Sequence, residues 1–80
     1  STVKTDWDQH SAVTMFSTAF NSLPNNGVMI ADHVEISWIN TALWSVLNAQ
    51  TSAGKTYNIS WIASEGDGEV VDVAVIKRLS

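Results

Sequence analysis

The chain has 80 residues, the length of one small domain, and 45% of them are hydrophobic, including four tryptophans. A hydrophobic core is therefore expected without metals or disulfides, as a single domain over residues 1–80. The absence of cysteine excludes a disulfide scaffold, a thiolate zinc site and a cysteine nucleophile. Only 15% of the residues are charged and the net charge is −4, so the basic stripe that nucleic-acid binding needs is missing. This composition favours a small acidic binding or structural domain over an enzyme.

The uncharged stretch 36–54 is long enough to raise the question of a membrane span. It carries serine, threonine, asparagine and glutamine throughout, which a bilayer core disfavours, so we expect no membrane span. No signal-peptide pattern is visible at the N-terminus. The sequence fits both an extracellular and a cytoplasmic protein, with a slight preference for secretion, and Asn58-Ile59-Ser60 matches the N-glycosylation acceptor.

The first predicted element is an amphipathic helix over residues 7–22. Apolar residues recur there at helical spacing, namely Ala12, Val13, Phe16, Ala19, Phe20 and Leu23. Asp6 is suited to cap the helix, with Gln9 three residues later in the capping-box position. Pro24 follows and ends the helix, because proline lacks a backbone donor and disfavours a helical predecessor.

The next segment, residues 28–39, is expected to be extended. Val34, Ile36 and Trp38 alternate with polar residues, which is the period of a half-buried strand. Residues 42–49 fit two structures: Leu43 and Val46 suit a short helix, whereas Trp44 and Val46 suit one face of a strand.

The last third of the chain predicts a β-hairpin. Apolar residues alternate over 56–64 and again over 69–78, and Glu65-Gly66-Asp67-Gly68 supplies turn chemistry between them. The fold class is therefore α+β, with one N-terminal helix packed on an antiparallel sheet of three or four strands. The order is α-β-β-β-β if 42–49 is a strand and α-β-α-β-β if it is a helix.

The sequence predicts no cofactor. Residues 49–56 end in Gly54-Lys55-Thr56 like a phosphate-binding loop, but the segment that follows is expected to be a strand instead of the helix that such a loop needs. The acidic residues near the hairpin turn, Glu65, Asp67, Glu69 and Asp72, are interpreted as a solvated tip and not as a calcium loop.

Catalysis is not expected either. His10 and His33 are the only imidazoles, and no acid/base pair stands out beside them. Of the tryptophans, at least two of Trp38, Trp44 and Trp61 are expected to pack in the core, and an exposed remainder would mark a partner surface.

A family resemblance follows from Gln50-Thr51-Ser52-Ala53-Gly54 with Tyr57 three residues later. This pattern resembles the first binding loop of the cystatins, the inhibitors of papain-like cysteine proteases, and the hairpin ending in Val75-Ile76-Lys77-Arg78-Leu79 is similar to that of the stefin branch. The resemblance spans roughly residues 42–79. It implies a cystatin-like α-β-β-β-β fold and a non-catalytic protease inhibitor that blocks the protease cleft with residues 50–54.

The alternative function is a structural or interaction subunit, such as a secreted, toxin-like or virion protein. Such a subunit is expected to assemble as an oligomer through a sheet edge or an exposed tryptophan.

Overall fold

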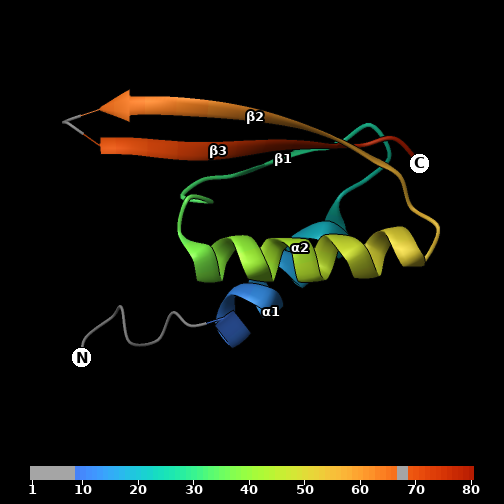
Figure 1. The fold of residues 1–80 in the computed structure, drawn as a ribbon. Helices are drawn as coiled ribbons and strands as arrows, with labels where there is room; N and C mark the ends of the chain where they lie inside the picture. The colour runs from blue at the N-terminus through green and yellow to red at the C-terminus, as the bar shows by residue number, and fades with distance from the viewer. Residues whose placement is uncertain (1–8, 67–68) are drawn as a thin grey trace.

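The computed structural model describes residues 9–66 and 69–80 as two helices and three strands. In chain order these are α1 (Gln9–Ser22), β1 (Val28–Ala31), α2 (Ser37–Ser52), β2 (Tyr57–Gly66) and β3 (Glu69–Arg78). The strands form one antiparallel sheet in the order β1-β3-β2, with both helices on the same side of it (Figure 1). The α+β class is confirmed, and the element order is the α-β-α-β-β alternative.

Helix α1 buries the apolar stripe that its spacing predicts. Ala12, Phe16 and Phe20 are separated by four residues each and are at most 3% exposed. Phe20 meets Tyr57 of β2 edge to face, with 5.2 Å between the ring centroids, so the C-terminal end of the helix is fixed against the sheet. Residues 7 and 8 of the predicted helix lie outside the described residues.

The predicted strand over 28–39 is correct only for its first third. β1 ends at Ala31, His33 takes a left-handed φ of 58°, and the N–H of Ile36 donates to the carbonyl of His33 at 3.1 Å before α2 begins at Ser37. The rest of the predicted strand is wrong because buried Val34 and half-buried Trp38 are four residues apart, a spacing that suits a turn of helix as well as a strand.

Helix α2 includes residues 42–49, the segment for which the sequence leaves two structures open. Its buried residues are Ala42, Leu43, Val46 and Leu47, which form one stripe at helical spacing. The helix ends in a Schellman motif: Lys55 N–H donates to the carbonyl of Gln50 and Gly54 N–H to that of Thr51. Gly54 has a φ of 99°, which glycine adopts without the steric cost of a side chain.

The predicted hairpin is confirmed as β2 and β3, while its turn residues 67 and 68 lie outside the described residues. Ile59 pairs with Ile76 and Trp61 with Ala74, so these residues share the face of the sheet that the helices cover. On the other face no described helix covers the aliphatic side chains, and Val28, Ile30 and Ile62 are 53%, 68% and 52% exposed.

Candidate interaction surface

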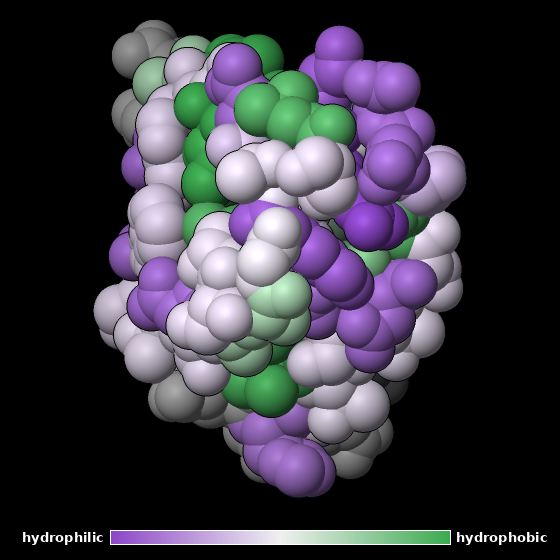
Figure 2. Space-filling model, turned by 90° about the vertical axis from the view of Figure 1, so that its right-hand side faces the viewer, coloured by the Kyte–Doolittle hydropathy of each residue, from purple (hydrophilic) through white to green (hydrophobic). Residues whose placement is uncertain are grey.

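The segment Gln50–Gly54, predicted as a protease-binding loop, connects a helix to a strand. Gln50, Thr51 and Ser52 form the last turn of α2, Ala53 is its C-cap, and Gly54 follows in the left-handed conformation. Residues 51–54 are exposed. Figure 2 views the molecule from this end, where hydrophilic and near-neutral residues cover most of the surface and hydrophobic ones form separate patches.

The side chain of Gln50 holds three elements together at this end. Its Nε2 donates to Asn21 Oδ1 of α1 at 3.0 Å, and its Oε1 accepts from Lys55 Nζ at 2.8 Å and from the Tyr57 hydroxyl at 3.5 Å. Burial raises the pKa of Tyr57, and the nearby positive charge of Arg78 partly offsets this. Gln50 therefore contributes to the fold, and Lys55 is bonded within the chain.

The described part of the chain contains no cluster of three or more His, Asp or Glu side chains that could hold a metal ion. His10 is exposed on α1, and His33 lies 3.2 Å from Glu35 through Nδ1 and Oε2. Asp72 lies within β3, and the side chains of the other acidic residues near the hairpin turn lie outside the described part of the chain. The imidazole and carboxylate side chains of the described ranges therefore form no metal-binding cluster.

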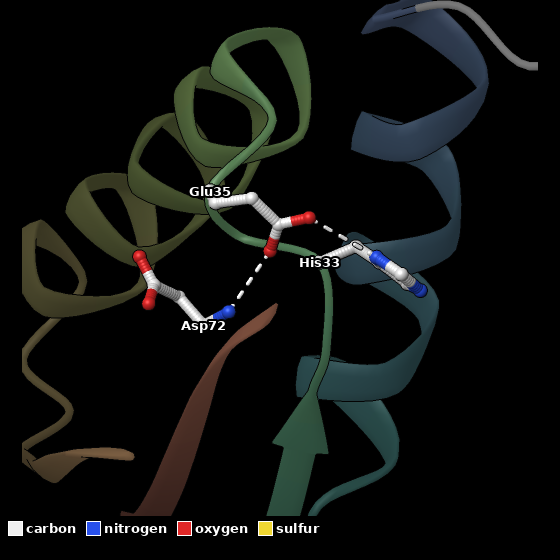
Figure 3. A network of polar contacts seen from close by, with 3 residues as sticks. All are labelled: His33, Glu35 and Asp72. Carbon is white, nitrogen blue, oxygen red and sulfur yellow. Dashed lines mark hydrogen bonds and ion pairs between the residues drawn. The ribbon is translucent and has the colours of Figure 1, made fainter. Parts of the chain in front are cut away.

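The contacts of His33, Glu35 and Asp72 protect one edge of the sheet (Figure 3). β1 ends at Ala31, which leaves the backbone of β3 uncovered beyond that point. There the N–H of Asp72 donates to Glu35 Oε1 at 2.9 Å, and its carbonyl accepts from the N–H of Val34 at 3.1 Å. The bond from Asp72 N–H is the main reason that the pKa of Glu35 lies below its ordinary value of 4.5.

The opposite edge of the sheet is β2, and its outward backbone groups have no strand beside them among the described residues. The carbonyl of Thr56 accepts from Leu79 N–H at 2.8 Å, so it faces the β3 side. Because backbone groups alternate in direction along a strand, the N–H and C=O groups of Tyr57, Ile59, Trp61 and Ala63 face the free edge.

Two exposed aromatic side chains lie along this edge. Trp61 of β2 stacks on Trp44 of α2 with 6.1 Å between the ring centroids, and they are 50% and 38% exposed. Trp38 alone of the three tryptophans considered packs against the core, so the prediction that at least two do so is wrong. Trp7 lies outside the described residues. The sequence signal for this surface is the uncharged alternation over 57–64, which predicts the strand but not its place at the edge.

A pocket of about 530 Å³ lies between α1 and the segment 30–39. Its lining is apolar except for Asp32 and His33 at the start of the turn that follows β1. Ligand sites usually combine an apolar lining with several convergent polar groups that orient the ligand. This pocket offers room for an apolar group but lacks such a set.

Comparison with protein-family models, curated proteins and solved structures found no match for the chain. Neither of the described helices is long and apolar enough to cross a membrane.

Proposed function

We propose that this chain is a non-catalytic protein-binding module that adds an extended strand of its partner to the free edge of β2. The observation that carries the proposal is the edge itself: ten residues of strand from Tyr57 to Gly66, without proline. Soluble proteins usually shorten, charge or cover such an edge, because its unpaired N–H and C=O groups attract other strands.

The contrast between the two edges supports this function. β1 has only four residues, and the Glu35 carboxylate and the Val34 N–H occupy the backbone of Asp72 beyond it. β2 has no comparable cover among the described residues, and no charged residue stands between Tyr57 and Ser64. These contacts cover part of the sheet on the β1 side, whereas no such contact covers β2 among the described residues.

The side chains beside the open edge define the partner that it fits. Trp44 and Trp61 offer an aromatic surface on the helix side of the sheet, and Ile62 offers an aliphatic one on the uncovered side. In strand addition the backbone bonds supply affinity, and the side chains on alternate faces supply specificity. The partner is therefore an extended, uncharged segment with apolar residues on both faces.

The proposal is tested with peptides selected from a displayed library of extended sequences. We expect binders that slow amide exchange at Ile59, Trp61 and Ala63 and that lose affinity at least tenfold for Ala63→Pro, which removes an outward N–H. Ala63→Val keeps that N–H and is the matched control. Peptides that slow amide exchange only at other residues contradict the proposal. So do peptides whose affinity for Ala63→Pro equals their affinity for the unaltered protein.

A second candidate function is inhibition of a papain-like protease, which the exposure of residues 51–54 favours together with the cystatin resemblance. The assay measures papain activity with added protein. Inhibition at micromolar concentration that Ser52→Lys abolishes and Ala63→Pro leaves intact assigns the function to this segment. No inhibition at that concentration counts against it.

A further inference from the structure

We infer that the strand paired with β2 is β2 of a second copy, antiparallel across a two-fold axis at Trp61. This inference rests on the proposed function, because it names the partner of the same edge. A two-fold interface brings the same surface of both copies together, so the edge must be complementary to itself.

The direction of the backbone groups restricts the register. Only residues whose N–H and C=O face the free edge can exchange hydrogen bonds, namely Tyr57, Ile59, Trp61 and Ala63 among the residues with described side chains. In an antiparallel pair about a two-fold axis, the numbers of opposite residues have a constant sum. An axis at Trp61, near the middle of β2, pairs Ile59 with Ala63 of the second copy and keeps almost the whole strand paired.

The side chains fit this register on both faces of the joined sheet. On the helix side, large Ile59 lies opposite small Ala63, and the Trp44–Trp61 stacks of the two copies meet at the axis. On the uncovered side, Ile62 lies opposite Ser60. Cross-strand neighbours of this kind are the contacts that stabilise paired strands.

The paired part of the edge carries no charge. No charged residue stands between Tyr57 and Ser64, so this register brings no like charges together along these residues.

The available area sets the expected strength. A tryptophan offers up to ~250 Å², so Trp61 at 50% and Trp44 at 38% exposure leave roughly 200 Å² per copy for burial. With the paired backbone added, the total stays below the ~1,600 Å² of a standard interface. We therefore expect a reversible dimer with a dissociation constant in the micromolar range.

Sedimentation of the full chain from micromolar to millimolar concentration tests the dimer. We expect a reversible dimer whose fraction rises with concentration across this range. Ala63→Lys should weaken it at least tenfold, whereas Val28→Lys, at an exposed site on β1, should leave it unchanged. A monomer throughout the range, or a dimer that Ala63→Lys does not weaken, overturns the inference.

Cysteine cross-linking tests the register, because the chain contains no cysteine of its own. Ser60 and Ile62 are exposed, and they face each other across the inferred axis. A mixture of Ser60→Cys and Ile62→Cys proteins should oxidise to a mixed dimer, whereas mixing Ser60→Cys with Val28→Cys should not. Cross-linking of Ile62→Cys to itself in preference to the mixed dimer contradicts the axis at Trp61.

These results separate the two proposals. If the chain stays monomeric while selected peptides bind β2 and lose affinity for Ala63→Pro, the second copy is excluded and the protein-binding function stands. If neither copies nor peptides bind this edge, the proposed function fails with it.

Discussion

Gly54 shows how one residue type serves two structures that the sequence does not distinguish. A tight turn between strands and a helix that ends in a Schellman motif both place glycine at positive φ. The residues from Gln50 to Gly54 therefore fit a cystatin-like loop in sequence, while the structure places them at the end of α2. Leu43 and Val46, further upstream, distinguish the two structures, because they are buried on one face of a helix.

The φ of 99° at Gly54 predicts the cost of replacing it. A Cβ at this position meets no atom within 4 Å, so only the backbone conformation opposes a side chain. We expect Gly54→Val to lower the free energy of unfolding by about 1–2 kcal/mol. Gly54→Asn should cost less, because asparagine tolerates the left-handed region. Urea unfolding measures both, and equal stability of all three proteins contradicts the assigned conformation.

The contribution of Glu35 to the stability of the fold depends on pH, because its carboxylate accepts a hydrogen bond at one edge of the sheet. The N–H of Asp72 donates to its carboxylate, and this bond lowers the pKa of Glu35 below 4.5. A carboxyl whose pKa is lower in the folded state stabilises the fold above its unfolded pKa, and that contribution is lost as pH falls through the folded value. His33 adds a weaker attraction when it is protonated.

Comparison of the protein with Glu35→Gln tests this linkage. We expect the unaltered protein to be the more stable above about pH 4.5, by an amount that is constant there and that shrinks as pH falls further. The measurement is the urea midpoint of both proteins across this range. A difference that does not depend on pH, or that grows in acid, contradicts the role given to Glu35.

At the scale of elements, the predictions succeeded where one period was unambiguous. α1 has a stripe at four-residue spacing that ends before Pro24, and the hairpin has two alternating runs joined by turn residues. The expectation of a strand through residue 39 failed because Val34 and Trp38 are four residues apart, a spacing that fits both periods. No proline or glycine separates β1 from α2, so the chain lacks the usual signal that one element has ended.

The position of β2 at the free edge also does not follow from the order of the elements in the sequence. β2 and β3 are consecutive and pair as a hairpin, so either could lie at the edge of the sheet. The outcome depends on β1, which pairs with β3 over Val28–Ala31 and so leaves β2 outside. This long-range pairing has no local signature, and the exposure of Trp61 follows from it.

At the scale of the whole molecule, a two-layer fold leaves apolar groups uncovered in two places. Both helices lie on one side of the sheet, so the aliphatic side chains of its other face remain at the surface. The edge of β2 adds unpaired backbone groups and the Trp44–Trp61 pair. The edge is the stronger basis for function, because backbone hydrogen bonds fix the direction and register of a partner, which aliphatic contact alone does not.

Amide hydrogen exchange along β2 tests the central claim most directly. In dilute protein we expect fast exchange at Ile59, Trp61 and Ala63, whose N–H groups face the free edge, and slow exchange at Ser60 and Ile62, whose N–H groups face β3. At high concentration, or with a selected peptide, the fast amides should become protected while the slow ones change little. Fast amides that stay unprotected under both conditions, or that are already protected in the dilute protein, contradict the claim that this edge binds the partner strand.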